Sequence, residues 1–225
     1  MPSSPSSPSR SKFTAGGVRE YEKKRYRGLD QRIVHARETR MIGLLLDTAL
    51  AGVAAGRIAR LLDLPCGYGR FTGPLLERGV DVVISDLSLE MVRRTRERLG
   101  TPGAVADATR GLPFAGGVFD AVVSIRFFHH LHAPEARATV LGEFARTSAG
   151  WAIVSFYRES GLHLSQRRIR RFFGKSRTNI KMLEKGVFER EAQGAGFDVV
   201  KVVPLFRGLH AYHLALLKKR SAGGR

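Results

Sequence analysis

The chain has 225 residues, of which 43% are hydrophobic, and its 38 lysines and arginines outnumber 20 acidic residues, which gives a formal net charge of +18. This length is enough for one large domain, or a domain plus a small cap, that buries its own core. The single cysteine excludes an internal disulfide framework. No apolar run approaches the ~20 residues of a membrane helix and no secretory segment follows Met1, so we expect a soluble, cytoplasmic protein.

The N-terminal stretch, residues 1–17, consists mainly of Ser, Pro and Gly, with two basic residues and no acid. Such a segment buries too little apolar surface to offset the entropy of ordering it, so we expect a disordered tail. The domain itself is expected over residues 18–220, beginning with an N-terminal helical arm at 18–52.

Helices and strands are expected to alternate after this arm. The first helix, at 32–50, has Ile33, Arg37, Met41, Leu44, Leu45 and Leu46 at helical spacing. Strands are expected at 57–64, 80–85, 104–106, 119–125 and 151–156, and helices at 71–78, 89–99 and 134–147. This alternation indicates a parallel sheet with crossover helices.

The end of the chain has a different pattern. The link at 205–209 between the β-rich runs 197–204 and 210–218 is too short for a crossover helix, so these runs must pair antiparallel. We therefore expect an α/β fold: a doubly wound, mostly parallel seven-stranded sheet with an antiparallel C-terminal hairpin.

A glycine-rich turn follows the first strand, at residues 62–70. Asp63 precedes Gly67 and Gly69, which can adopt backbone angles closed to other residues and let the main chain approach a ligand. The dinucleotide fingerprint needs a third glycine where Thr72 stands, which disfavours NAD. S-adenosylmethionine is the favoured alternative.

Two further acids stand at expected strand ends. Asp86 lies 17 residues after Gly69, where a carboxylate can accept hydrogen bonds from both ribose hydroxyls. Asp107 ends the next short strand, a feature that dinucleotide enzymes do not usually share.

With these motifs, residues 21–219 resemble the class I S-adenosylmethionine-dependent methyltransferases, in particular the broad group of ubiquinone, menaquinone and natural-product enzymes. The resemblance identifies 63–69 as the glycine loop, Asp86 as the ribose acid and Asp107 as the acid at the adenine edge. Pro65 stands where the family usually has glycine, so the loop lacks one N–H donor. The implied cofactor contacts are Asp63, Cys66, Gly67, Gly69, Asp86, Leu87, Asp107, Ala108, Arg126 and Arg25.

Arg25 belongs to a basic, tyrosine-containing stretch at 21–28, which in similar enzymes folds over the methionine half of the cofactor. An arginine there could hold the methionine carboxylate while a tyrosine shields the sulfonium. The alternative is a basic linker that packs on the surface. Cys66 is expected to be a small buried residue of the loop.

The segment 126–132, after the fourth strand, contains His129, His130 and His132. Histidine accepts a proton near neutral pH, so His130, and second to it His129, are candidate bases for a hydroxyl or amine acceptor. In the family one such ring can instead cap the helix or pack against the cofactor. We expect no metal, because no Cys or carboxylate lies at ligand spacing from these histidines.

A basic segment separates the fifth strand from the terminal hairpin. Residues 158–190 contain ten basic residues and three acids, with helical patches expected at 164–173 and 181–188. We expect residues 160–185 to form a mobile lid over the acceptor. An acidic or phosphorylated acceptor, an anionic membrane surface, RNA or plain solvation of a helix face would each account for this charge.

Absent motifs narrow the acceptor. The chain lacks the Asn/Asp-Pro-Pro-aromatic motif of amide and base methylation, the Pro-Cys pair of cytosine C5 methylation near the fourth strand, and the strand-end acids of magnesium-dependent catechol enzymes. We expect a monomer or homodimer that methylates a small molecule on oxygen, nitrogen or carbon. An RNA- or protein-modifying enzyme recruited by the basic segment is the rival, and a non-enzymatic binding module is the third alternative.

Overall fold

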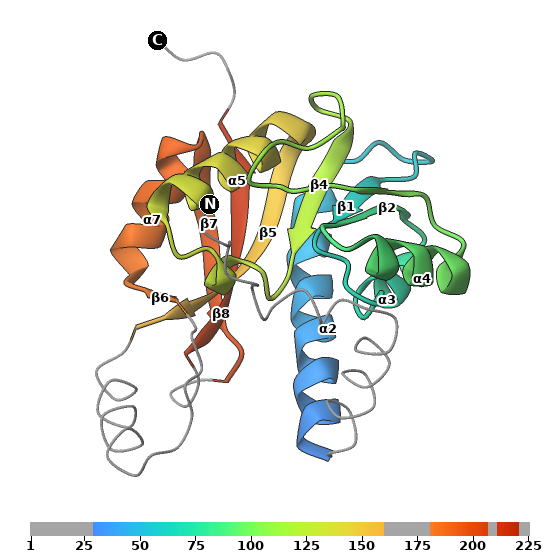
Figure 1. The fold of residues 1–225 in the computed structure, drawn as a ribbon, viewed down its shortest axis with the longest axis horizontal. Coiled ribbons are helices and arrows are strands. Elements are labelled where there is room, and N and C mark those ends of the chain that lie inside the picture. The colour runs from blue at the N-terminus through green and yellow to red at the C-terminus, as the bar shows by residue number, and fades with distance from the viewer. Residues whose placement is uncertain (1–28, 160–180, 207–210, 221–225) are drawn as a thin grey trace, which may run out of the picture.

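A computed structural model describes residues 29–159, 181–206 and 211–220. They form an eight-stranded sheet in the order β3-β2-β1-β4-β5-β8-β7, with β6 paired to β5 (Figure 1). The expected tail at 1–17, the residues 18–28 of the arm, which include Arg25, and residues 160–180 of the expected lid lie outside the described residues.

The expected α/β fold is confirmed. Every strand pair is parallel except those of β8, which runs antiparallel to both β5 and β7. The strands are β1 (Arg60–Asp63), β2 (Asp81–Asp86), β3 (Gly103–Val105), β4 (Phe119–Ser124), β5 (Ser148–Arg158), β6 (Met182–Leu183), β7 (Phe197–Pro204) and β8 (Tyr212–Lys219). The helices are α2 (Leu29–Leu50), α3 (Thr72–Leu76), α4 (Leu89–Leu99), α5 (Pro134–Thr147) and α7 (Lys185–Gly194), with a 3₁₀ turn, η2, at Phe128–His130.

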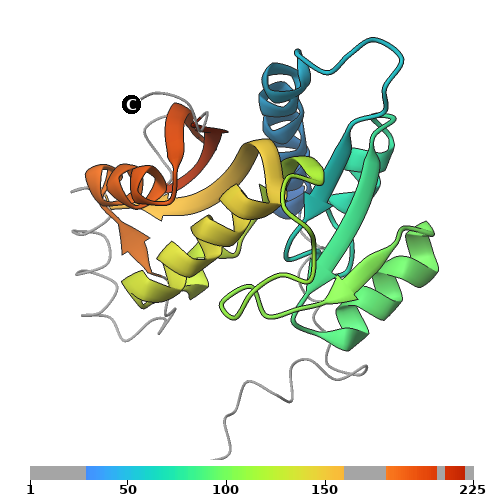
Figure 2. The same cartoon turned by 90° about the horizontal axis from the view of Figure 1, so that it is seen from above.

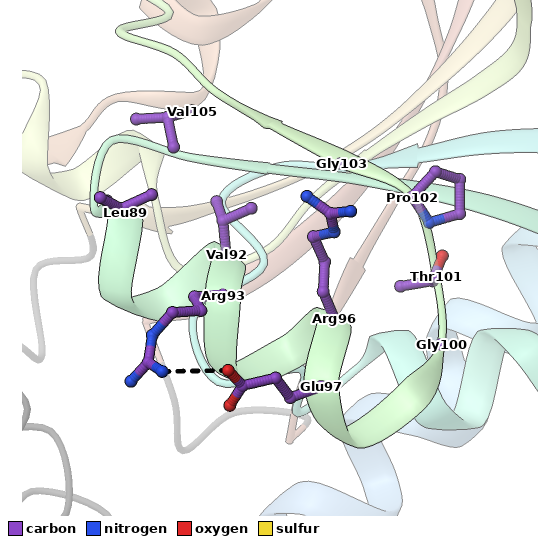
Figure 3. A pocket seen from close by; sticks show the side chains of 10 residues that line it. All are labelled: Leu89, Val92, Arg93, Arg96, Glu97, Gly100, Thr101, Pro102, Gly103 and Val105. Carbon is purple, nitrogen blue, oxygen red and sulfur yellow. Dashed lines mark hydrogen bonds and ion pairs between the residues drawn. The ribbon is translucent and has the colours of Figure 1, made fainter.

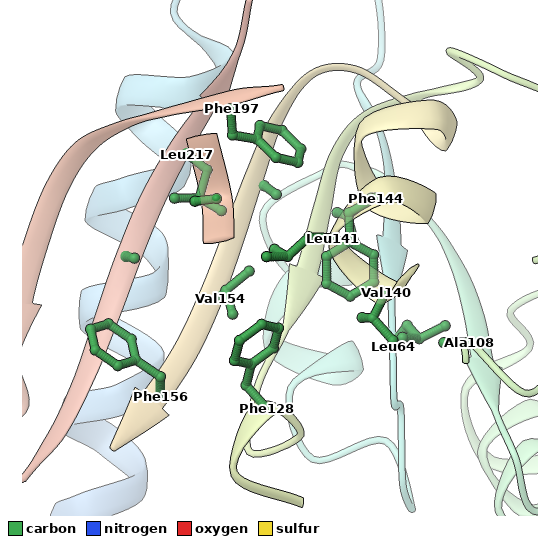
Figure 4. Close-up of a cluster of buried hydrophobic side chains, with 14 of the residues drawn as sticks. Leu64, Ala108, Phe128, Val140, Leu141, Phe144, Val154, Phe156, Phe197 and Leu217 are labelled. Atoms are coloured by element: carbon green, nitrogen blue, oxygen red, sulfur yellow. The ribbon is translucent and has the colours of Figure 1, made fainter. Parts of the chain in front are cut away.

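Two apolar clusters form the core, one on each face of the sheet, because successive strand residues point to opposite faces. Leu62 packs with α5 and α7 in the first cluster, which includes Phe128, Phe144 and Phe156 (Figure 4). Leu61 packs with α2 and α3 in the second. Figure 2 accordingly shows α2 and α5 on opposite sides of the sheet.

The helix α2 packs on the sheet with only part of the residue set that its sequence predicts. Leu45 and Leu46 of this set are buried, whereas Ile33 and Leu44 are 54% and 59% exposed. The buried stripe also contains Glu38, Ile42 and Ala49, which the predicted set does not include. Apolar residues lie on two sides of α2, and only contact with the sheet decides which of them are covered.

The segment 181–188, expected to be helical, is another correction. Met182 and Leu183 form β6, whose register pairs them with Tyr157 and Arg158 of β5. The helix α7 begins after Glu184, whose extended backbone ends the strand. Because both β6 residues are buried against the sheet, strand pairing prevails over the helical pattern of the sequence. Among the described residues, no helix is both long and apolar enough to cross a bilayer.

Candidate functional site

The strand order reverses direction between β1 and β4. The connections that leave the two strands diverge at this point, and ligands of open α/β sheets bind there, outside the carboxyl ends of the strands. The glycine loop follows β1, and the segment that starts at Arg126 follows β4. The fold therefore brings the two predicted site segments to one edge of the sheet.

The glycine loop has the backbone that its sequence requires, with φ of 54° at Gly67 and 78° at Gly69. The loop is held from two sides. Cys66 donates its backbone N–H to the carbonyl of Ser85 at 2.9 Å, while Thr95 of α4 donates its hydroxyl to the carbonyl of Gly67 at 3.0 Å. A Cβ on Gly67 would meet nothing within 4 Å, so the space beside this residue is open.

Gly69 allows a direct test of this loop. An added Cβ would lie 2.8 Å from Thr95 Cγ2 and 2.8 Å from an Arg98 nitrogen, and the φ of 78° strains any side chain. We expect Gly69→Ala to lower the free energy of unfolding by about 1–3 kcal/mol in urea titrations. Gly73→Ala is the control. Gly73 lies in the helix α3, where an added Cβ has open space, so this substitution should not lower the free energy of unfolding. Equal stability of the two variants would contradict the tight packing of Gly69.

Asp86, at the end of β2, is joined to the glycine loop. Its two carboxylate oxygens accept the backbone N–H groups of Gly67 at 3.0 Å and of Ser88 at 2.9 Å. Burial raises the pKa of Asp86, and the N–H groups of Ser88 and Gly67 counteract that rise. A carboxylate has about four acceptor sites, so Asp86 can still accept a hydrogen bond from a further donor. The next residue, Leu87, is 67% exposed.

Asp63 and Cys66 face inward. Asp63 is 1% exposed and accepts the Thr72 hydroxyl at 2.5 Å, which ties the loop to α3. Burial raises the pKa of Asp63 to about 7. Burial likewise raises the pKa of the Cys66 thiol, so the thiol stays protonated and unreactive at neutral pH.

Asp107 follows the edge strand β3. One carboxylate oxygen accepts both the backbone N–H of Thr109 at 2.9 Å and its hydroxyl at 2.6 Å. The Asp107 side chain is about one-third exposed, while the neighbouring Ala108 is buried in the core. The three acids therefore occupy different environments, buried for Asp63, nearly buried for Asp86 and partly open for Asp107.

The segment after β4 contains the histidine candidates. His129 is 8% exposed and its ring centroid lies 5.0 Å from that of Tyr157, in β5. His130 is exposed, with its ring 4.0 Å from that of His129. Across 29–159, 181–206 and 211–220, no three His, Cys, Asp or Glu side chains are grouped as a metal site would require.

Two residues of the candidate site were not predicted from the sequence. They are Glu38 of α2 and Arg70, which directly follows the glycine loop. Glu38 is fully buried and accepts hydrogen bonds from Arg70 at 2.7 Å and from Arg126 at 2.9 Å. A sequence signal for Glu38 exists: it is an acid four residues before Ile42, on what proves to be the buried stripe of α2.

A cavity of about 620 Å³ lies at the β3 edge of the sheet, between α4 and the stretch 100–105 (Figure 3). Arg93, Arg96 and Glu97 contribute its charged lining, and Arg93 pairs with Glu97. None of the sequence-predicted cofactor residues lines it. This cavity is therefore distinct from the glycine-loop site.

Comparison with known proteins adds independent information. Residues 62–153 match the methyltransferase domain family. A demethylmenaquinone methyltransferase of Beutenbergia cavernae is 50% identical over 64 residues, which are 28% of this chain and 26% of that protein. The tRNA (carboxymethyluridine(34)-5-O)-methyltransferase alkbh8 of Xenopus tropicalis is 33% identical over 97 residues, 43% of this chain and 14% of that protein. The chain thus spans about a quarter or less of the length of these curated relatives.

Solved structures extend the likeness to the whole fold. Magnesium protoporphyrin IX methyltransferase from Synechocystis PCC 6803, with bound S-adenosylhomocysteine, superposes with a TM-score of 0.73 at 15% identity, over 94% of this chain and 98% of that one. A TehB-like enzyme from Corynebacterium glutamicum gives 0.63 at 19% identity, over 92% and 100%. The chain is thus similar to the methyltransferase domain family over residues 62–153, and it shares the overall fold of these solved methyltransferases.

Proposed function

We propose that the protein transfers a methyl group from S-adenosylmethionine to a small-molecule acceptor. The observation that carries this proposal is the contact of Asp86 with the N–H of Gly67, which joins the end of β2 to the glycine loop at the point where the strand order reverses. The relatives named for quinone and porphyrin methylation support a small acceptor.

The residues present suit this cofactor. Gly67 leaves open space for a ligand beside the backbone, and Asp86 and Asp107 offer carboxylates for hydroxyl and amine donors. The bound cofactor supplies an already activated methyl group, so the protein chiefly has to hold the acceptor ~3 Å from the methyl carbon and exclude water.

A proton acceptor is needed only where the acceptor atom must lose a proton. His130 is our first candidate because its ring is exposed at the carboxyl edge of the sheet. His129 is the second. Its ring packs edge-to-face on Tyr157 and beside His130, so it fixes the position of the exposed ring as well.

We expect Asp86→Ala to weaken S-adenosylhomocysteine binding by ~2–4 kcal/mol, since hydrogen bonds to a charged acceptor are lost. Isothermal titration calorimetry measures the change. Asp81→Ala, at the opposite end of β2 in an exposed pair with Arg60, is the matched control and should bind as the wild type does.

Asp86 also anchors Gly67, so a second ligand separates the two roles. If Asp86 binds the ribose, Asp86→Ala should weaken the binding of S-adenosylhomocysteine far more than the binding of its 2′-deoxy analogue. Equal losses would assign the effect to the loop, and unchanged affinity for both ligands would contradict the ribose contact.

RNA modification is the second candidate, favoured by the net charge of +18 and the tRNA-modifying relative. Binding driven by phosphate contacts falls steeply with salt. A mobility assay with bulk RNA at near-physiological salt distinguishes the proposals: retained binding supports RNA as the substrate, and its loss supports a small molecule.

A further inference from the structure

The buried carboxylate of Glu38 joins three separate parts of the fold. It lies on α2, its partner Arg70 follows the glycine loop, and its partner Arg126 follows β4. The two ion pairs therefore stand where the strand order reverses, beside the loop that we propose binds the cofactor. None of the three side chains is more than 22% exposed.

The charges of these three side chains do not cancel, because two guanidinium groups share one carboxylate. Arg70 also contacts His35, whose Nδ1 accepts the Nε–H of Arg70 at 3.0 Å. An Nδ1 that accepts this bond carries no proton, so His35 is neutral in this arrangement. The cluster of Glu38, Arg70 and Arg126 thus has a net charge of +1 in a mostly buried place, where a bound anion is favoured.

Arg126 is held firmly from three directions. Its backbone adopts a φ of 60°, and its N–H donates to the Ser155 hydroxyl at 2.6 Å. Its Nε donates to Glu38 at 2.9 Å, and its guanidinium carbon lies 5.4 Å from the centre of the Tyr212 ring. Within the described residues, the hydrogen bonds of its side chain use Nε alone, so both Nη atoms remain available as donors.

From this geometry we propose that Arg126 binds a carboxylate group of a ligand through its Nη atoms, with Glu38 and Arg70 as positioning residues. The inference rests on the proposed function. A guanidinium matches a carboxylate with two parallel hydrogen bonds, and a guanidinium already fixed in place loses little entropy on binding. The carboxylate belongs either to the methionine end of the cofactor or to the acceptor.

The test is calorimetry on wild-type protein and on Arg126→Gln with three probes. S-adenosylhomocysteine carries the amino-acid carboxylate, 5′-methylthioadenosine lacks it, and benzoate, titrated into the protein saturated with S-adenosylhomocysteine, represents an acidic acceptor. If the cofactor supplies the carboxylate, Arg126→Gln should bind S-adenosylhomocysteine about 10–100-fold more weakly and methylthioadenosine unchanged. If the acceptor supplies it, only the binding of benzoate should be lost.

The variant is suited to this comparison. Removing Arg126 leaves Glu38 paired with Arg70, one charge against one, so the fold should persist. Arg126→Lys keeps the charge without the two-pronged geometry and should recover part of the lost affinity. Gln and Lys face the same backbone cost at the φ of 60°. Arg57→Gln, in an exposed pair with Asp120 at the start of β4, is the matched control.

The outcomes separate the inference from the proposed function. Arg126→Gln with wild-type affinity for all three probes would overturn the inference alone. A wild-type protein that binds neither S-adenosylhomocysteine nor methylthioadenosine would overturn both. Weaker binding of methylthioadenosine by Arg126→Gln would also count against the inference, because that ligand has no carboxylate.

Discussion

Glu38→Gln is expected to lower the free energy of unfolding by about 3–5 kcal/mol, because it leaves two mostly buried guanidinium groups without their carboxylate. Glu38 is fully buried, and the side chains of Arg70 and Arg126 are 9% and 22% exposed. Water therefore solvates the two guanidinium groups poorly once the carboxylate is gone. The amide oxygen of glutamine can still accept a hydrogen bond from one arginine, but it cannot neutralise either. Urea unfolding, followed by circular dichroism, measures the loss.

A second acid on the same helix provides the control. Asp47 of α2 forms an exposed ion pair with Arg78, with side chains 60% and 38% exposed. Solvent screens such a pair, so Asp47→Asn should change stability by less than about 1 kcal/mol. Both substitutions replace a carboxylate of α2 by the amide of the same shape and remove one negative charge. The main difference between the two sites is therefore the burial of the side chain. If Glu38→Gln costs no more than Asp47→Asn, the buried cluster does not stabilise the fold.

The sequence predicts most of the fold because strong local signals agree with the tertiary structure. The limits of α4 are correct because Ser88 caps its first turn and Gly100, with a φ of 66°, ends it. The hairpin of β7 and β8 is correct because a short link leaves only antiparallel pairing. The predicted residue set of α2 was only partly correct, and the two-residue strand β6 was not predicted, since both depend on contacts with the sheet that no local pattern encodes.

The residues of the candidate site likewise include some that local sequence patterns indicate and some that only the fold brings together. Gly67, Gly69 and Asp86 could be named from spacing, because a turn and a strand end are local features. The ion pairs from Glu38 to Arg70 and Arg126 span 32 and 88 positions of sequence. Only the folded sheet brings these residues together, so composition and periodicity could not reveal them. The tight packing of Gly69 against α4 is long-range for the same reason.

Asp63 should make stability fall as the pH rises from about 4 to 7. Burial, with a further contribution from the charge of Asp86, raises its pKa from 3.8 to about 7, although the Thr72 hydroxyl opposes the rise. Between these values the native protein holds a proton that the unfolded chain releases, so the native state loses stability as pH increases. At 1.36 kcal/mol per pH unit, the full effect is on the order of 4 kcal/mol, present below pH 4 and lost by about pH 7.

Asp63→Asn isolates this effect, because asparagine is neutral at every pH, has nearly the same shape and can still accept the Thr72 hydroxyl through its amide oxygen. Other groups titrate over the same range, so the informative quantity is the difference in unfolding free energy between variant and wild type. We expect this difference to move in favour of Asp63→Asn as pH rises from 4 to 8. Asp81→Asn, at the exposed start of β2, should show a constant difference. If the Asp63→Asn and wild-type curves stay parallel in urea titrations across this range, the buried carboxyl is already ionised at pH 4.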